Sequence, residues 1–283
     1  MGQIIAVANQ KGGVGKTTTA LNLGASLAAA EQRVLLVDMD PQGNLSSGLG
    51  YPKARIEQHL YHVLSGERAL DEVIVDTELE YLRLAPTHTD LIGAEIELVG
   101  DEARHGRLAA AIEQVAPRFN YVLIDCPPSL GLLTLNALVA ADSVIVPLQC
   151  EYFALEGLSH LLATIERVRA IYKPALALEG VLLCMYDRRM NLTQQVANEV
   201  REHFVGQVFD TVIPRNVRLA ESSSFGKPVL LYDVESAGAR AYLQLAQELM
   251  RRRDAQVAPQ PPRPAPSRAV TQRRALSASG GTE

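Results

Sequence analysis

The sequence predicts an α/β fold: a doubly wound, mostly parallel sheet with helices on both faces. Three observations carry this prediction. Short apolar runs of strand length alternate with helical segments along most of the chain, which is the pattern of a parallel sheet built from crossover units. Some runs are apolar at every position, as in residues 34–37, which is typical of strands covered on both faces. A glycine-rich loop joins the first strand to the first helix.

The individual elements follow from apolar periodicity and from their stop signals. Residues 104–116 show the clearest helical period, with Leu108, Ile112 and Val115 on one face. Pro86 and Pro214 end the strands before them. Strands are expected at residues 3–8, 34–37, 82–85, 121–124, 143–147, 181–186 and 208–213. Helices are expected at residues 17–30, 57–64, 89–99, 104–116, 132–140, 158–172, 191–204 and 235–253.

The loop after the first strand has the composition of a phosphate-binding loop. Its residues are Lys11, Gly12, Gly13, Val14, Gly15, Lys16, Thr17 and Thr18. Glycines let backbone N–H groups close around phosphate oxygens, and the following helix points its positive dipole end at the same place. Lys16 is expected on the β- and γ-phosphates of a nucleotide and Thr17 on Mg²⁺. The chain is therefore expected to be a single-domain P-loop NTPase.

Two details of this loop depart from the strict pattern G-x-x-x-x-G-K-[ST]. Gln10 stands where that pattern has glycine, and a second lysine, Lys11, precedes the glycines. The chain has only five lysines beside 22 arginines. Two lysines in one loop therefore indicate a need for compact positive charge near phosphate.

Three aspartates follow strands that should end at the same edge of the sheet. Asp38 and Asp40 come after the second strand, and Asp125 ends the run Tyr121-Val122-Leu123-Ile124. Carboxyl ends of parallel strands meet at one edge of the sheet, so these carboxylates are expected beside the loop. Asp125 is expected to hold a magnesium-bound water.

Composition limits the other possibilities. The formal net charge is −5, but residues 251–283 carry seven arginines against Asp254 and Glu283. Residues 1–254 are expected to form the P-loop domain, and the Pro/Arg-rich residues 255–283 a disordered tail. The scattered cysteines (Cys126, Cys150 and Cys184) indicate neither a disulfide framework nor a zinc site. No apolar run is long enough to span a membrane, and the predicted location is the cytoplasm.

Taken together, several blocks resemble the ParA/MinD family of deviant Walker A ATPases. They are KGGVGKTT, VDMDPQGN, VLIDCPPS, MYDRRMNLTQQV and IPRNVRLAES followed by GKPV. The resemblance covers roughly residues 1–250 and is closest to the small chromosomal ParA (Soj) partition proteins. It implies an ATP- and Mg²⁺-dependent ATPase that dimerises with ATP.

The resemblance also assigns roles to single residues. Lys11 matches the signature lysine that reaches the partner's nucleotide across the dimer, so Lys11 and Lys16 together neutralise charge during hydrolysis. Asp40 matches the residue that positions the attacking water, and Asp38 supports the magnesium shell. No strong base or arginine finger is visible in the sequence, so slow, partner-stimulated hydrolysis is expected.

Further implied contacts concern DNA and adenine. Arginines matching Arg189 and Arg218 bind DNA non-specifically in relatives, and Arg188 and Arg215 are their neighbours here. Pro214 and Asn216 match positions that hold adenine. The implied partners are a second copy of the chain, non-specific DNA and a ParB-like centromere-binding protein, with a nucleoid-associated location.

Alternative interpretations differ in the surface or cofactor they need. A MinD-like positioning ATPase would need a C-terminal amphipathic helix for the membrane, but the prolines of residues 259–266 give none, so no stable membrane association is expected. An iron-protein relative would need cluster cysteines, which Cys126 and Cys184 do not resemble. A non-enzymatic scaffold would not need Lys16, Asp40 and Asp125. A partition ATPase with a protein cargo stays open.

Overall fold

The computed structural model describes residues 2–152 and 154–257. The chain divides into two compact units, Met1–Leu249 and Met250–Glu283. The first unit contains the whole sheet. Of the second unit, the described residues are the last turns of the final helix.

One seven-stranded sheet forms the centre of the first unit, in the order β3-β4-β2-β5-β1-β6-β7. All neighbouring strands are parallel except β3 and β4, which pair antiparallel. This confirms the predicted fold class. The strands are β1 (Gln3–Val7), β2 (Val34–Asp38), β3 (Val75–Asp76), β4 (Leu82–Ala85), β5 (Tyr121–Asp125), β6 (Ser143–Gln149) and β7 (Ala177–Cys184).

The helices follow the strands in the alternating order expected of crossover connections. They are α1 (Lys16–Ala29), α2 (Asn44–Gly48), α3 (Leu60–Ser65), α4 (Leu70–Val73), α5 (Leu91–Glu97), α6 (Arg107–Val115), α7 (Leu132–Ala140), α8 (Ala154–Ile171), α9 (Asn191–His203), α10 (Val217–Ser224), α11 (Val229–Tyr232) and α12 (Ala237–Val257). Single 3₁₀ turns lie at Lys53–Arg55, Leu98–Gly100 and Ala116–Arg118.

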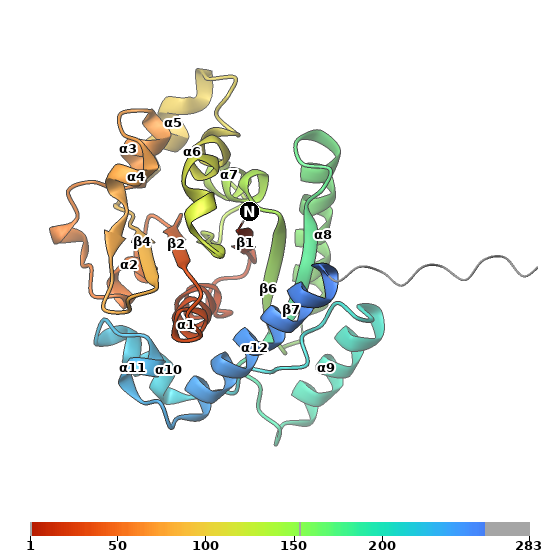
Figure 1. Ribbon diagram of the computed structural model, residues 1–283. Coiled ribbons are helices and arrows are strands. Elements are labelled where there is room, and N and C mark those ends of the chain that lie inside the picture. The colour runs from red at the N-terminus through yellow and green to blue at the C-terminus, as the bar shows by residue number, and fades with distance from the viewer. Residues whose placement is uncertain (1, 153, 258–283) are drawn as a thin grey trace, which may run out of the picture. The chain divides into compact units, whose positions relative to one another are not determined.

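Helices cover both faces of the sheet (Figure 1). One face packs against α3 to α8, and its core includes alternate strand residues such as Leu35, Val37, Val122 and Ile124. The opposite face packs against α1, where the Gly24 position meets the Leu36 side chain. Successive strand residues point to opposite faces of the sheet. Because helices cover both faces, the residues that point to either face are buried.

The expected strand at residues 208–213 was wrong. The segment makes only isolated bridges, Val208 with Val181 and Pro214 with Tyr186. Between them, the amides of Asp210 and Thr211 donate to the Glu248 carboxylate of α12, each at 2.9 Å. These amides are therefore unavailable to β7, and the ladder is interrupted.

Other boundaries also moved. β7 and α8 each begin four residues earlier than expected. The final helix extends to Val257, past the predicted domain boundary at 254, and the remainder of the predicted tail, 258–283, lies outside the described residues. No helix in the described part of the chain combines the length and apolarity required to cross a bilayer.

Candidate nucleotide-binding site

The glycine-rich loop leaves β1 and enters α1 at the carboxyl edge of the sheet. Gly13 (φ +73°) and Gly15 (φ +98°) adopt left-handed backbone conformations that glycine tolerates best. A Cβ atom built on Gly12 or Gly13 would have no described atom within 4 Å. The loop thus forms an open backbone cradle at a helix N-terminus, which is suited to phosphate.

Lys16 is buried at the floor of this cradle. Its side chain folds back so that Nζ donates to the Lys11 carbonyl oxygen at 3.1 Å, and the residue is 7 % exposed. Burial lowers the pKa of Lys16, and the negative charge of Asp125 is the largest opposing influence. Lys16 is therefore a buried cation beside a buried carboxylate.

Asp38 is held by a short helix that the sequence did not reveal. Its Oδ2 accepts from the Ser46 hydroxyl at 2.6 Å and the Ser46 amide at 2.8 Å, at the start of α2. The Ser46 oxygen in turn accepts from the Thr87 amide at 3.2 Å. Burial raises the pKa of Asp38 to about 7, although the Ser46 hydrogen bonds oppose the shift.

Asp125 is the partner of Asp38 in the parallel register of β2 and β5. Asp125 is fully buried, and neither carboxylate oxygen has a hydrogen-bond partner of normal geometry among the described residues. Burial raises its pKa well above the usual range, and the charge of Asp38 adds to the shift. The nearby Thr17 side chain partly opposes this shift. A buried carboxylate that lacks a hydrogen bond of normal geometry and lies beside a hydroxyl has the oxygen chemistry that Mg²⁺ requires, so these residues fit that ion.

Asp40 lies at the rim of the same site. Its Oδ1 accepts from the Gln42 amide at 2.9 Å, and the residue is 7 % exposed. The charge of Asp40 adds to the raised pKa values of Asp38 and Asp125 and opposes the lowering of the Lys16 pKa. The structure thus brings together every acid and base that the sequence placed at the phosphates except Lys11.

Lys11 points elsewhere. Its Nζ pairs with the Glu151 carboxylate, which follows β6, and both side chains are nearly half exposed. The Lys11 amide donates to Asn9 Oδ1 at 3.0 Å, and the Asn9 amide group is anchored on the Pro147 carbonyl at 2.7 Å. Sequence reasoning missed Glu151. The available signal was an acid just after a strand that ends at the loop's edge.

A cavity of about 740 Å³ extends from the end of the loop toward α10. Gly15, Thr17 and Thr18 line one side, and Pro214 and Asn216 line another. Asn216 also caps α10 by accepting from the Arg218 amide at 2.9 Å. The predicted adenine-side residues and the phosphate loop therefore share one cavity.

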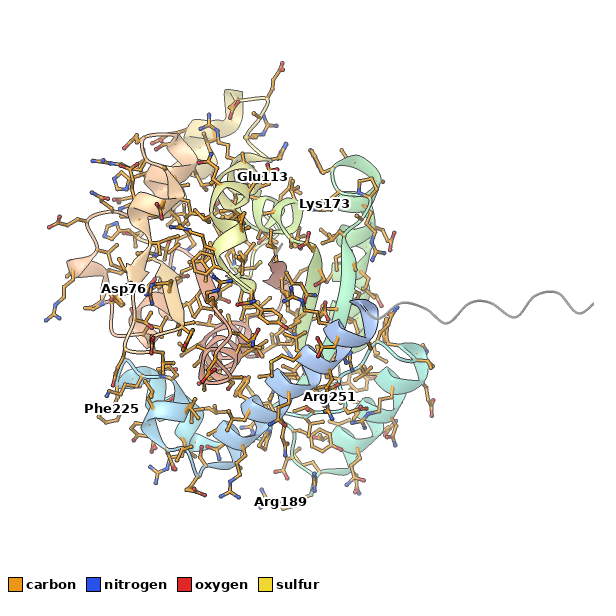
Figure 2. All side chains as sticks on the ribbon, viewed as in Figure 1. Asp76, Glu113, Lys173, Arg189, Phe225 and Arg251 are labelled. Atoms are coloured by element: carbon orange, nitrogen blue, oxygen red, sulfur yellow. The ribbon has the colours of Figure 1, made fainter. Side chains whose placement is uncertain are left out.

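Three of the four predicted DNA-contacting arginines line a second hollow of about 640 Å³: Arg188, Arg189 and Arg215. Arg240 of α12 joins them and was not predicted. Arg189 projects from the surface (Figure 2) and is 90 % exposed, with a two-pronged contact to Asp187 at 2.8 and 3.0 Å. That contact lowers the pKa of Asp187 to about 2.

Arg218 lies outside this hollow, on α10. It pairs with Glu221 at 2.8 Å and with Asp233 at 3.2 Å. By contrast, neither Arg188 nor Arg215 makes an ion pair with any residue that the structure describes. The four predicted arginines thus differ in how much their charge is already neutralised.

Comparison with known proteins gives a clear family. Residues 2–178 match the AAA domain family. The chromosome partitioning protein ParA of Myxococcus xanthus is 56 % identical over 252 residues, which cover 89 % of each chain. The sporulation initiation inhibitor protein Soj of Bacillus subtilis is 55 % identical over 249 residues, covering 88 % of this chain and 98 % of Soj. The chain belongs to the ParA/MinD family of ATPases. The resemblance expected from the sequence motifs is confirmed.

Solved structures of relatives share the fold of this ParA-type chain. Cobyrinic acid a,c-diamide synthase from Mycobacterium smegmatis, with a bound ATP analog and magnesium, is 39 % identical with a TM-score of 0.80, covering 90 % of this chain and 97 % of that one. The cell division ATPase MinD from Pyrococcus furiosus is 29 % identical with a TM-score of 0.74, covering 89 % and 99 %.

Proposed function

We propose that this chain is a Mg²⁺-dependent ATP hydrolase that dimerises with ATP and binds DNA non-specifically. In this proposal it drives chromosome or plasmid partitioning with a ParB-like partner. The observation that carries the proposal is the contrast between its two loop lysines. Lys16 is buried in the loop, whereas Lys11 leaves the loop to pair with Glu151.

The buried residues supply the nucleotide chemistry. Lys16 and the loop amides neutralise charge on the β- and γ-phosphates, and Thr17 offers its hydroxyl to the metal. Asp38 and Asp125 would hold the water shell of a bound Mg²⁺ through their buried oxygens. Asp40 orients the attacking water. Bound Mg²⁺ supplies further neutralisation of the charge that develops on the phosphoryl group.

Lys11 supplies the link between nucleotide and dimer. Because its Nζ is directed to Glu151 and toward solvent, its charge is available to a nucleotide held by a second subunit. A γ-phosphate opposite Lys11 would offer more negative charge than one carboxylate. Binding of ATP would then favour the dimer, because its γ-phosphate would contact Lys11 of the second subunit in the dimer but not in the monomer.

Exposed apolar side chains lie where such a dimer would form. Leu130 follows β5 and is 44 % exposed, and Tyr152 follows β6 and is 79 % exposed. Both strands are parallel to β1 and end at the sheet edge that carries the loop; Tyr152 lies three residues past β6, and Leu130 lines a hollow with the end of α8. Large apolar groups exposed beside a nucleotide site indicate a protein-binding surface.

For DNA we propose the surface around the arginine-lined hollow, with Arg218 as a further contact. Arg188 and Arg215 can meet phosphate directly, whereas Arg189 and Arg218 must exchange a carboxylate for a phosphate. Each monomer offers few contacts, so dimerisation would double the charge presented to DNA. Binding should therefore depend on ATP and fall steeply with salt.

The proposed cargo, a chromosome or plasmid, is argued from the chain's similarity to its relatives. Proteins named for chromosome partitioning are 56 % identical to this chain, against 29 % for the MinD structure and 39 % for the diamide synthase. This supports partitioning on the nucleoid, with hydrolysis that is slow until a ParB-like protein stimulates it. Positioning of a protein cargo on DNA is the second candidate, because it would use the same arginine surface.

The deciding experiment measures mass and DNA retention together. The full chain is examined by light scattering and by filter retention of non-specific DNA, with ATP, with ADP and without nucleotide. A dimer that is retained only with ATP supports the proposal, and a chain that binds DNA equally well without nucleotide contradicts it. Lys16→Gln is the control that should stay monomeric throughout. Addition of the ParB-like protein should accelerate phosphate release and lower retention.

We also propose that the ATPase domain, predicted as 1–254, is independent of the Pro/Arg-rich tail. A chain ending after α12, at Val257, should keep its ATPase activity. Loss of activity on this truncation would assign a structural role to the tail. Weaker retention on DNA with unchanged ATPase would instead assign it a role in attracting DNA.

A further inference from the structure

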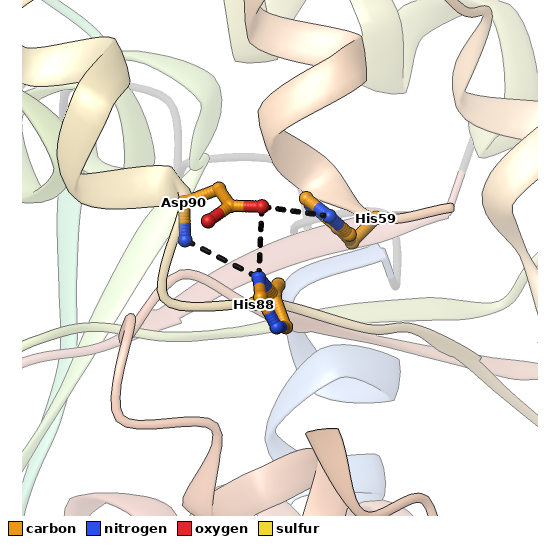
Figure 3. Close-up of side chains that lie close together, drawn as sticks. All are labelled: His59, His88 and Asp90. Carbon is orange, nitrogen blue, oxygen red and sulfur yellow. Dashed lines mark hydrogen bonds and ion pairs between the residues drawn. The ribbon is translucent and has the colours of Figure 1, made fainter. Parts of the chain in front are cut away.

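The side chains of two histidines and an aspartate lie close together in space, at positions far along the sequence from the nucleotide loop. His59 precedes α3, and His88 and Asp90 lie in the connection between β4 and α5 (Figure 3). The Leu60 amide donates to the Pro86 carbonyl at 3.0 Å and fixes the start of α3 against that connection. One ligand-type atom from each of the three side chains lies within 4.8 Å of the others.

Two of the three separations between the ligand atoms suit one small ion. His88 Nδ1 is 2.9 Å from Asp90 Oδ2, and His59 Nε2 is 3.8 Å from the same oxygen. Ligands about 2.0–2.1 Å from a tetrahedral Zn²⁺ lie roughly 3.3 Å apart, between these two values. Two imidazole nitrogens and one carboxylate are a usual zinc donor set, and solvent would complete the shell at exposed Asp90.

The buried member of the cluster lacks the side-chain hydrogen bonds that a structural histidine normally has, although its ring contacts those of His62 and His88. His59 is 3 % exposed, and its Nδ1 has no hydrogen-bond partner among the described residues. Its Nε2 is too far from Asp90 for a hydrogen bond and is directed at the same point as His88 Nδ1. Burial lowers the pKa of His59 to about 4, so the ring is neutral near pH 7 and keeps a lone pair for a metal.

We propose that His59, His88 and Asp90 form a binding site for Zn²⁺, separate from the magnesium site at the phosphate loop. Imidazole nitrogen favours zinc over magnesium, whereas the all-oxygen site of Asp38 and Asp125 has the opposite preference. The two ions would therefore not compete.

The position of the site gives the ion a structural role. His88 follows Thr87, whose amide donates to the Ser46 oxygen that holds Asp38. A metal that joins His59 to His88 would tie α3 to the connection after β4. It would thereby fix the far end of the hydrogen-bond chain that positions Asp38.

The test uses the full chain purified without a histidine tag and stripped with EDTA. Excess Mg²⁺ and ADP occupy the nucleotide site, and Zn²⁺ is then added. We expect one Zn²⁺ per chain by elemental analysis after gel filtration, a higher Tm, and visible bands of tetrahedral geometry when Co²⁺ replaces Zn²⁺. His88→Gln and Asp90→Asn should each weaken binding about tenfold or more.

Controls keep the result decisive. His160→Gln changes an exposed histidine of α8 outside the cluster and should bind like the wild type. His59→Gln changes a buried group, so the two more exposed positions carry the conclusion, and retained ADP binding shows that those variants are folded. No stoichiometric zinc on the wild type, or equal affinity in His88→Gln and Asp90→Asn, would overturn the proposal.

Discussion

Asp38 and Asp125 are register partners at the ends of adjacent parallel strands, and both are fully buried. Burial raises the pKa of both carboxylates; the charge of Asp38 adds to the shift of Asp125, and the charge of Asp40 adds to both. Lys16 is a cation close enough to Asp125 for the two charges to interact. A bound divalent ion would favour the ionised form of both carboxylates. Ionising two neighbouring buried carboxylates is unfavourable without such an ion, and this is the basis of the proposed magnesium site.

The first prediction concerns pH. Unfolded Asp38 ionises near pH 3.8, whereas folded Asp38 keeps its proton to about pH 7. Between these values the native state binds more protons than the unfolded state. The contribution of Asp38 to the free energy of unfolding should therefore fall as pH rises, by at most about 1.4 kcal/mol per pH unit. Urea unfolding of the metal-free protein at pH 5, 6 and 7 measures this slope.

Asp38→Asn is the matched control for the pH prediction. The amide keeps an oxygen for the Ser46 hydroxyl but does not titrate, so the variant should lose part of the slope. Mg²⁺ requires the ionised carboxylate, so Mg–ADP affinity of the wild type should rise from pH 6 to pH 8, and less so in the variant. Identical slopes in the two proteins would mean that Asp38 does not titrate as proposed.

The Lys11–Glu151 pair predicts a separation of ATP binding from dimerisation. Lys11→Ala should bind ATP within a few-fold of the wild type but remain monomeric, because its side chain is not at its own phosphates. Glu151→Gln should dimerise at lower ATP concentration, by no more than about fivefold, because an exposed ion pair contributes at most about 1 kcal/mol.

Sedimentation at graded ATP concentrations measures both variants of this pair. Glu156→Gln, an exposed acid on α8, is the control and should behave like the wild type. If Lys11→Ala forms a dimer at the same ATP concentration as the wild type, Lys11 does not act at the proposed interface.

Asp40 predicts a trapped state. Asp40→Ala should slow hydrolysis about 100-fold or more, which is the usual effect of losing a residue that orients or deprotonates the nucleophile. ATP binding should persist, so dimers should accumulate on DNA and resist release by the ParB-like protein. Single-turnover phosphate release and DNA retention measure the two effects. A variant that stays monomeric with ATP would contradict the mechanism.

Loss of the Ser46 hydroxyl should lower both the stability of the protein and its affinity for Mg–ADP. Ser46→Ala removes the hydroxyl that donates to Asp38 and leaves the Thr87 amide without its acceptor. A loss of about 1–3 kcal/mol in the free energy of unfolding is expected. The pKa of Asp38 should rise further and Mg–ADP should bind more weakly. Ser47→Ala, at the exposed neighbouring position, should leave the free energy of unfolding nearly unchanged.

The arginines predict a graded weakening of DNA binding. Arg188→Ala and Arg215→Ala should each weaken ATP-dependent retention and reduce the salt slope by about one, because one phosphate fewer is neutralised. Arg189→Ala and Arg218→Ala should weaken retention too, but less, because each arginine must first leave a carboxylate. Arg68→Ala, an exposed arginine paired with Glu72 elsewhere, is the control. Unchanged retention in all four variants would reject this surface.

Local patterns predicted most of the fold. The strands at 34–38, 82–85 and 121–125 are apolar runs whose composition favours burial, and the structure places them within one residue of the expected bounds. The segment 208–213 failed because its amides are bonded to Glu248, more than 35 residues away. The sequence of the segment 208–213 does not predict that contact.

The sequence by itself determined the phosphate loop, its two lysines and the edge of the sheet at which the aspartates lie. These features depend on glycine's backbone freedom and on the direction of parallel strands, which are local properties. Tertiary structure alone decided that Asp38 pairs with Asp125, that Ser46 holds Asp38, that Lys11 pairs with Glu151 and that His59 meets His88. Strand order and register set those distances, and they arise only when the whole core packs.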